Sequence, residues 1–161
     1  MSRHVLTRRK FLTAIPIAAT ASSCVTHAAE DSRIRIGQIG TKHAHASGKM
    51  LTMRKYSETF EVVGIVEPDT ARRTAMQERE PYRGLRWMTE RELLATPGLQ
   101  AVAVETDINS LVPTGIRCLQ AGKHIHLDKP AGESLDACRE MHRIATERHL
   151  TIQMGYMLRY N

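Results

Sequence analysis

Hydrophobic residues alternate between short continuous runs and amphipathic segments from residue 34 onward. The run Ala101-Val102-Ala103-Val104 does not alternate with polar residues, which is typical of a strand buried on both faces. Runs of this kind predict strands at 34–40, 60–66, 85–88, 99–105, 124–127 and 150–155. Strands that alternate with helices at this spacing predict an α/β domain with a doubly wound parallel sheet, covered on both faces.

The segments between the expected strands carry helix signals. They predict helices at 41–55, 69–79, 90–95 and 110–121, and one that starts at Ser134. Asp69 and Ser134 stand at expected N-caps, and Gly122 suits the left-handed position that ends a helix. Pro113 is expected in the first turn of its helix, where its missing N–H is harmless. The last helix is expected to bury an apolar face made by Leu135, Cys138, Met141 and Ala145.

Residues 1–28 are predicted to be an export signal rather than part of the fold. Thr7-Arg8-Arg9-Lys10-Phe11-Leu12 is a twin-arginine pattern, and the apolar run 11–25 after it is too short to span a bilayer comfortably. Small residues before Ala29 predict cleavage after Ala28, which leaves a periplasmic or otherwise extracytoplasmic protein with no membrane segment. Cys24 lacks the preceding leucine of a lipoprotein signal, so lipidation is disfavoured. A fortuitous basic terminus is the alternative.

The export signal also explains the basic composition of the chain. Of the 23 basic and 17 acidic residues, four basic and no acidic ones lie within residues 1–28. The remainder is close to neutral, has few aromatic residues and lacks a basic stripe, which argues against nucleic-acid binding.

The two cysteines outside the export signal, Cys118 and Cys138, have no Cys-x-x-Cys spacing. They could pair in an exported protein, but their apolar helix positions favour buried free thiols.

The most informative segment is Asp128-Lys129-Pro130, directly after the short apolar run 124–127. An acid, a lysine and a proline at the carboxyl end of a parallel strand stand where open α/β sheets bind ligands. This corner resembles the Glu-Lys-Pro signature of the Gfo/Idh/MocA oxidoreductases, with Asp128 in place of the glutamate. The segment 155–161 is similar to the Gly-aromatic-x-x-Arg run that closes the nucleotide domain of that family.

The resemblance implies a Rossmann-type NAD(P)-binding domain at 33–156, with 157–161 as the start of a C-terminal α/β domain that is missing here. It also implies NAD(P)-dependent oxidation or reduction of a hydroxyl on a sugar, cyclitol or similar polyol. Lys129 is then the expected catalytic residue, and it lies with Asp128 beside the nicotinamide. A surface lysine is the alternative. In the family, the missing domain carries the substrate pocket and the oligomer interface, so the chain alone is expected to be inactive.

The first strand-to-helix turn, Gly40-Thr41-Lys42-His43, stands where a dinucleotide fold holds the pyrophosphate. Of the fingerprint Gly-x-Gly-x-x-Gly only Gly40 remains, because Lys42 and His45 replace the later glycines. The Lys42 side chain would either crowd the pyrophosphate or approach a phosphate as a point charge. A binding module that kept the fold and lost the cofactor is therefore an alternative function.

Two further residues complete the expected cofactor site. Glu67 ends the second strand, where an acid accepts hydrogen bonds from the adenosine ribose and repels a 2′-phosphate, so NAD is favoured over NADP. A solvated loop acid is the alternative interpretation of Glu67. Thr106 follows the fourth predicted strand, and the resemblance places it near the nicotinamide half of the cofactor.

Two His-x-His pairs, His43 with His45 and His124 with His126, raise the possibility of a metal. Residues two apart on a strand share a face, which suits metal coordination. However, His124 begins its strand, far from the edge where His43 is expected. No cysteine or clustered carboxylate in the sequence completes either pair. A metal site is therefore not predicted, and a periplasmic metal-binding protein is the weakest of the alternatives.

Overall fold

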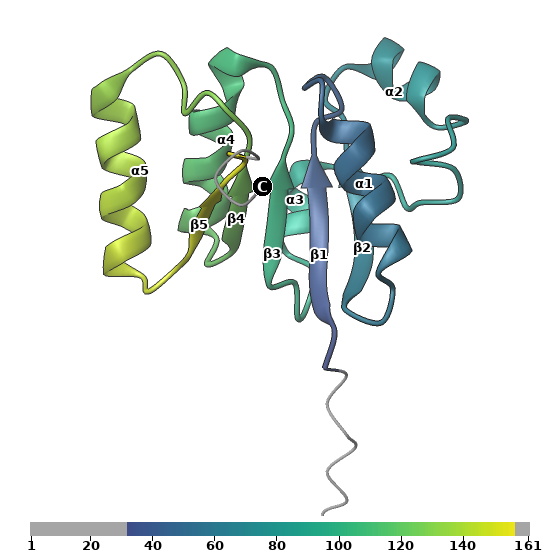
Figure 1. Cartoon of the computed structure of the whole chain (residues 1–161), viewed down its shortest axis with the longest axis horizontal. Helices are drawn as coiled ribbons and strands as arrows, with labels where there is room; N and C mark the ends of the chain where they lie inside the picture. Colours follow the sequence, from purple (N-terminus) through teal and green to yellow (C-terminus); the bar gives the residue numbers. More distant parts are fainter. Residues whose placement is uncertain (1–31, 157–161) are drawn as a thin grey trace, which may run out of the picture. The chain divides into compact units, whose positions relative to one another are not determined.

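The computed structural model describes residues 32–156, so the predicted export signal and the segment 157–161 lie outside the described residues. The strands are β1 (Ile34–Ile39), β2 (Phe60–Val66), β3 (Ala101–Val104), β4 (His124–Leu127) and β5 (Ile152–Met154). The helices are α1 (Ala46–Lys55), α2 (Thr70–Met76), α3 (Glu90–Leu94), α4 (Ile108–Gln120) and α5 (Leu135–Glu147). All strand pairs are parallel, in the order β2-β1-β3-β4-β5 (Figure 1). The predicted Rossmann-type α/β sheet is confirmed.

The prediction of a further sheet strand at 85–88 is wrong. This segment contacts the sheet through one isolated parallel bridge between Ile65 and Trp87. Gly84, at φ +76°, turns the chain directly before it, and Thr89 caps α3 directly after it. Only a few residues remain between the turn and the cap, so the hydrophobic run is too short to add a sheet strand.

The two faces of the sheet are packed by different helices. Val102 and Leu127 point to one face, where they join a core that includes side chains of α4 and α5. Ile36 and Ala103 point to the other face and pack in a second core with Met50 of α1. Figure 1 shows α1 beside β1 and β2, and α4 with α5 at the β4–β5 end. The alternation of side chains along the strands therefore produces the doubly wound arrangement.

Most of the predicted helix boundary signals are confirmed. Asp69 and Ser134 are N-caps, and each side chain accepts a hydrogen bond from the third residue after it. Gly122, directly after the C-cap residue Ala121 of α4, has φ +75°. Pro113 does not lie in the first turn, because α4 begins five residues earlier, after its cap Asp107. At that position proline removes one hydrogen bond inside the helix.

The predicted apolar face of α5 is partly wrong. Leu135 is 65% exposed, because it is the first residue of the helix and precedes the side chains that pack on the core. Met141 and Ala145 are buried as predicted, Cys138 is partly buried against the core, and Ile144 is buried as well. Both described cysteines are free, and burial raises the pKa of the Cys118 thiol to about 12.

Among the described residues, no helix has the length and apolar character needed to cross a membrane.

Candidate functional site at the carboxyl edge of the sheet

The carboxyl ends of β1, β2, β3 and β4 are followed directly by Gly40 and by the three acids Glu67, Glu105 and Asp128. The chain goes from β1 to β2 on one side of the sheet and returns to β3 on the other side of β1. The order of the strands therefore reverses between β1 and β3. Ligands of open α/β sheets bind in the crevice at such a reversal, so this edge is the candidate site.

Gly40 is required at this reversal by the backbone of the neighbouring strand. Its φ is +89°, a conformation that residues with a side chain rarely adopt. A Cβ at this position would lie 2.7 Å from the carbonyl group of Glu105 and from the amide nitrogen of Thr106. Gly40, the only glycine left from the dinucleotide fingerprint, is therefore required by the fold itself, whether or not a pyrophosphate approaches it.

The backbone of the first turn already uses its hydrogen-bond donors within the protein. The N–H groups of residues 40–43 donate to the carbonyls of Val66 and Glu105 and to the carboxylate of Glu67, at 2.8 to 3.2 Å. In a typical phosphate-binding turn, these groups point at the ligand. Recognition of a pyrophosphate at this turn therefore has to depend on other donors.

Glu67 is buried and is not a solvated loop acid. One of its carboxylate oxygens accepts hydrogen bonds from the N–H and the hydroxyl of Thr41, at 2.9 and 2.7 Å, and the other accepts from the N–H of Asp69 at 3.1 Å. A carboxylate has about four acceptor positions, so about one remains for a ribose hydroxyl. Arg72 lies 3.8 Å from the same carboxylate and donates to the Thr41 hydroxyl at 2.8 Å.

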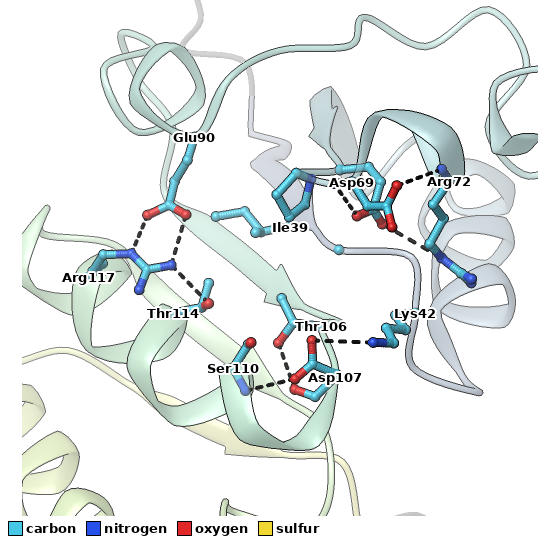
Figure 2. A pocket seen from close by; sticks show the side chains of 13 residues that line it. Ile39, Lys42, Asp69, Arg72, Glu90, Thr106, Asp107, Ser110, Thr114 and Arg117 are labelled. Atoms are coloured by element: carbon cyan, nitrogen blue, oxygen red, sulfur yellow. Dashed lines mark hydrogen bonds and ion pairs between the residues drawn. The ribbon is translucent and has the colours of Figure 1, made fainter. Parts of the chain in front are cut away.

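Two cavities open along this edge. The first, which we call the β2-side cavity, has a volume of about 650 Å³ and lies among the ends of β1 and β2 and the start of α4 (Figure 2). Its walls include the side chains of Ile39, Lys42, Glu67, Pro68, Asp69, Arg72, Glu90, Thr106, Asp107, Ser110, Thr114 and Arg117. The second has about 600 Å³ and is lined by Lys42, His43, Ala44, Thr106, Asp107, Ile108, Asn109 and Glu133. Both volumes lie in the range of small-molecule sites.

The two cavities share Lys42, Thr106 and Asp107 as lining residues. The Lys42 ammonium lies 3.8 Å from the Asp107 carboxylate, and the two side chains are 62% and 40% exposed (Figure 2). Such a pair contributes little to stability and opens readily. A ligand that fills both cavities would therefore pass directly over an ion pair that can be opened without disturbing the core.

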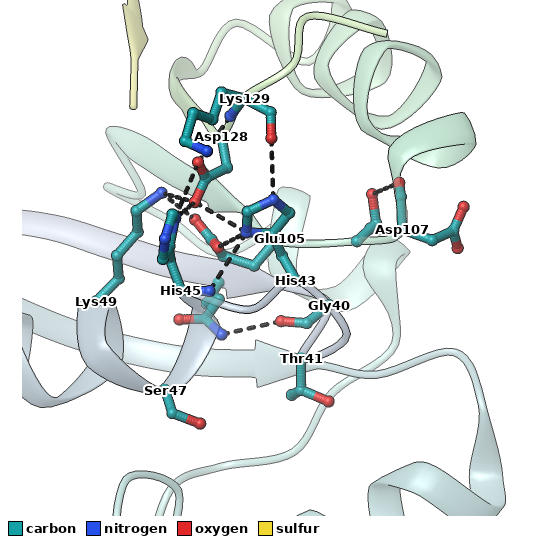
Figure 3. A network of polar contacts seen from close by, with 12 residues as sticks. Gly40, Thr41, His43, His45, Ser47, Lys49, Glu105, Asp107, Asp128 and Lys129 are labelled. Atoms are coloured by element: carbon teal, nitrogen blue, oxygen red, sulfur yellow. Dashed lines mark hydrogen bonds and ion pairs between the residues drawn. The ribbon is translucent and has the colours of Figure 1, made fainter. Parts of the chain in front are cut away.

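A compact group of polar and ionisable side chains lies on the other side of the first turn (Figure 3). We call His43, His45, Lys49, Glu105 and Asp128 the His–acid cluster. Lys49 extends from α1 and donates to Glu105 and to Asp128, at 2.6 Å in each case. Both carboxylate side chains have no exposed surface, while that of Lys49 is 22% exposed.

The two acids of the cluster differ in charge state. Burial raises the pKa of Glu105 to about 7, and the hydrogen bond from Lys49 offsets this only in part. Burial acts in the same sense on Asp128. There, hydrogen bonds from Lys49 and from the backbone N–H of Lys129 outweigh it and lower the pKa to about 2. Asp128 is therefore the ionised acid near neutral pH, and Glu105 is close to half protonated.

The two histidines of the first turn converge on Asp128. The Nδ1 atoms of His43 and His45 each lie 3.0 Å from its Oδ2 atom, and His43 Nε2 lies 3.0 Å from the Lys129 carbonyl (Figure 3). The sequence argument that no carboxylate completes this pair is wrong. Lys49 was missed altogether, although its spacing of four from His45 on a helix places both on one face.

The remaining predicted site residues separate into two groups. Gly40, Lys42, Glu67 and Thr106 line the β2-side cavity, with buried Thr41 bound to Glu67. Asp128 and Lys129 instead lie at the His–acid cluster. His43 belongs to this cluster and also lines the second cavity.

Lys129 itself is exposed, and its backbone holds it at the cluster. Its N–H donates to Asp128 Oδ1 at 2.7 Å, and its peptide bond to Pro130 is cis. As predicted, His124 is remote from the turn. It begins β4, and its Nδ1 accepts a hydrogen bond from the N–H of Thr151.

Comparison with known proteins decides the family. A family model described as an oxidoreductase family with an NAD-binding Rossmann fold, Gfo/Idh/MocA, matches residues 34–156. The chain belongs to the Gfo/Idh/MocA oxidoreductase family. No curated protein sequence gives a significant match.

Solved structures support the same fold for this Gfo/Idh/MocA domain. The WlbA dehydrogenase of Chromobacterium violaceum, in complex with NADH and UDP-GlcNAcA, is 22% identical with a TM-score of 0.71, over 82% of this chain and 37% of that one. UDP-N-acetylglucosamine 3-dehydrogenase GnnA of Acidithiobacillus ferrooxidans is 23% identical with a TM-score of 0.64, over 79% and 39%. Biliverdin reductase of Synechocystis, in complex with biliverdin and NADP+, is 20% identical with a TM-score of 0.65, over 75% and 37%. The chain thus spans less than half the length of these proteins.

Proposed function

We propose that this Gfo/Idh/MocA domain is the nucleotide-binding half of an NAD(P)-dependent oxidoreductase that acts on a hydroxyl of a sugar, cyclitol or similar polyol. The supporting observation is the pair of cavities at the strand reversal, which share Lys42, Thr106 and Asp107. Two of the similar structures are a dehydrogenase in complex with NADH and UDP-GlcNAcA, and a UDP-N-acetylglucosamine 3-dehydrogenase. The sugar-type substrate rests on these relatives.

In this proposal the adenosine occupies the β2-side cavity, where the remaining acceptor position of Glu67 takes a ribose hydroxyl. The nicotinamide occupies the second cavity beside Thr106. The pyrophosphate then crosses the first turn, where the backbone N–H groups already have acceptors. Lys42 leaves Asp107 and meets the phosphates as a point charge, in place of the engaged amides. Glu67 favours NAD, while the nearby Arg72 reduces the penalty for the 2′-phosphate of NADP.

The chemistry of the reaction lies at the nicotinamide end, where the bound cofactor accepts or supplies the hydride. Lys129 is proposed to orient the substrate hydroxyl and to assist movement of its proton. Its position is fixed by the bonds of its backbone to His43 and Asp128. The described domain thus supplies the cofactor side of the reaction. We propose that positioning of the substrate needs a further domain, of the kind that makes up the rest of the longer relatives.

Export by the twin-arginine route also belongs to the proposal. The pattern Thr7-Arg8-Arg9-Lys10-Phe11-Leu12 supports it. A protein that has to acquire a nucleotide in the cytoplasm gains from folding before export, because little free dinucleotide is expected outside.

The cofactor proposal is tested by titration with NADH. The chain has one tryptophan, Trp87, so energy transfer from its fluorescence to bound NADH reports binding. We expect saturable transfer, displacement by ADP-ribose, and weaker binding of NADPH. Absence of transfer at millimolar NADH and NADPH would contradict cofactor binding.

That outcome would instead favour a non-catalytic binding module that has lost the cofactor. The specific observation in favour of this second function is the first turn, where the N–H groups of residues 40–43 are all engaged within the protein.

The proposed need for a further domain is tested separately, by incubating the 161-residue chain with NAD and a panel of polyols. We expect no NADH, and polyol-dependent formation of NADH by the chain alone would refute the need for a further domain.

A further inference from the structure

We propose that His43, His45 and Asp128 form a binding site for a divalent transition-metal ion, with Glu105 as a fourth ligand within reach. The two histidines come from the turn before α1, and the acids follow β4 and β3. The site therefore combines side chains from three segments that are distant in the sequence. It does not depend on the proposed cofactor, since no nucleotide is needed to assemble it.

The distances between the candidate ligand atoms suit a metal. The Nδ1 atoms of His43 and His45 are each 3.0 Å from Asp128 Oδ2, and all three atoms lie within 4.8 Å of one another. Bonds of about 2.0–2.2 Å to nitrogen and oxygen place neighbouring tetrahedral ligands roughly 3.3–3.6 Å apart. Small movements of the three side chains would therefore open a position for an ion.

The hydrogen bonding of His43 fits a metal ligand. Its Nε2 atom lies 3.0 Å from the Lys129 carbonyl, which can only accept, so in the neutral ring Nε2 carries the proton. Its Nδ1 atom then carries the lone pair, which accepts a hydrogen bond from the His45 N–H at 3.3 Å and lies 3.0 Å from the Asp128 carboxylate, so a metal ion at this position would replace the His45 N–H as its partner. Histidines that bind metals commonly donate their second N–H to a carbonyl in this way.

An independent observation comes from Glu105. Its Oε2 atom is buried without a hydrogen-bond partner among the described residues, and it lies 3.7 Å from His43 Nδ1. An unpaired buried carboxylate oxygen is costly and indicates a missing partner. A divalent ion beside His43 would give this oxygen a partner, while Lys49 keeps its bond to the other oxygen of Glu105.

The ligand types select the class of metal. Two imidazoles with one or two carboxylates, and no thiolate, suit zinc, iron, cobalt or nickel better than calcium, magnesium or copper(I). The ammonium of Lys49, 2.6 Å from Asp128 Oδ2, is the natural competitor for the same oxygen. Metal binding would therefore require Lys49 to move from Asp128 or to share its carboxylate.

The test uses the untagged 161-residue chain with Co²⁺ and Zn²⁺ as probes. We expect one Co²⁺ per chain, with visible absorption bands stronger than those of the hydrated ion, and displacement of Co²⁺ by Zn²⁺. His45→Ala is expected to weaken Zn²⁺ binding by at least about 100-fold, the upper end of the effect of losing an outer-shell partner. His142→Ala, at an exposed position on α5, is the control and is expected to leave binding unchanged.

A second variant, His45→Gln, guards against a loss of fold, and circular dichroism of each variant checks it. Zn²⁺ is also expected to raise the thermal midpoint of the wild-type chain but not that of His45→Gln. Co²⁺ that stays in its hydrated form, or equal Zn²⁺ binding by the wild type and both His45 variants, would overturn the site. The NADH titration is a separate readout, so either proposal can fail while the other stands.

Discussion

Both ends of the carboxyl edge of the sheet contain acidic and basic side chains, but these side chains are arranged differently at each end. In the β2-side cavity, Glu67 with Arg72 and Lys42 with Asp107 are separate pairs at 3.8 Å, and an open volume of about 650 Å³ lies between them. In the His–acid cluster, a single lysine binds two fully buried acids, and two histidines close over them. The first end borders an open cavity that can hold a large ligand, whereas the second is closed by ion pairs and hydrogen bonds to buried acids.

Glycines on both sides explain how the cluster becomes so compact. Gly155 follows β5, and a Cβ there would lie 2.8 Å from Asp128 Oδ1. Gly40 allows the first turn to lie directly against the backbone after β3. The cluster is therefore confined by close backbone approach, while the β2-side cavity borders on the exposed loop at Pro68 and Asp69. Substitutions at the two ends are accordingly expected to differ in cost.

The largest effect is expected at Gly40, which belongs to both ends. Gly40→Ala combines a left-handed backbone with a clash against backbone atoms, and should lower the free energy of unfolding by about 2–3 kcal/mol. Gly48→Ala, inside α1, is the matched control, because a Cβ at this position would meet no atom within 4 Å. It should raise the free energy of unfolding by about 0.5–1 kcal/mol. Urea denaturation measures both. Equal effects would show that the close approach at Gly40 is not required.

An effect of similar size is expected at Lys49, within the cluster. Lys49→Met removes the cation shared by Glu105 and Asp128 and leaves two buried acids without it. Loss of one partner from a buried ion pair costs about 3–5 kcal/mol, and we expect about 2–3 kcal/mol because Lys49 is partly exposed. Denaturation at pH 8 measures the loss. A change below about 0.5 kcal/mol, the size expected of a surface pair, would remove the distinction between the two ends.

The sequence predicts the fold and the β2-side cavity better than it predicts the cluster. Uninterrupted apolar runs indicate parallel strands, and the residue after each strand falls at one edge, so Gly40 and Glu67 can be placed together from the sequence. The run at 85–88 misleads, because its length alone cannot distinguish a strand from a single bridge. The predicted start of α4 at Ser110 is two residues too late, so the prediction puts Pro113 in the wrong turn.

The cluster could not be read from any one motif. His43 and His45 form a visible pair, but their partner Asp128 is more than 80 residues away along the chain. That contact is set by the parallel register of β3 with β1 and β4, which positions the strand ends relative to one another. Lys49 lies inside an ordinary helix pattern and carries no signal by itself. Lys49 would have been indicated by looking for a charged residue four positions after His45 and pairing it with the acids at the strand ends.

A smaller effect is expected at Arg72, at the β2-side end. Its side chain is a third exposed, and its guanidinium donates to Thr41 beside Glu67. Arg72→Met should lower the free energy of unfolding by about 1 kcal/mol, since Glu67 keeps its bonds to Thr41. If Arg72 also offsets the charge of a 2′-phosphate, the same variant should weaken NADPH binding more than NADH binding. A loss of stability as large as that of Lys49→Met would mean that both ends depend equally on buried charge.

The smallest effect on stability is expected at Lys42, between the two cavities. Its pair with Asp107 is exposed, so Lys42→Ala should change the free energy of unfolding by less than about 0.5 kcal/mol. Its effect on the cofactor should be larger: loss of a point charge at the pyrophosphate is expected to raise the Kd for NADH about fivefold. Lys55→Ala removes the same charge at an exposed position at the end of α1 and should leave the Kd unchanged. Tighter NADH binding by Lys42→Ala would show that the side chain obstructs the passage between the two cavities, which would leave the turn with no donor for the phosphates.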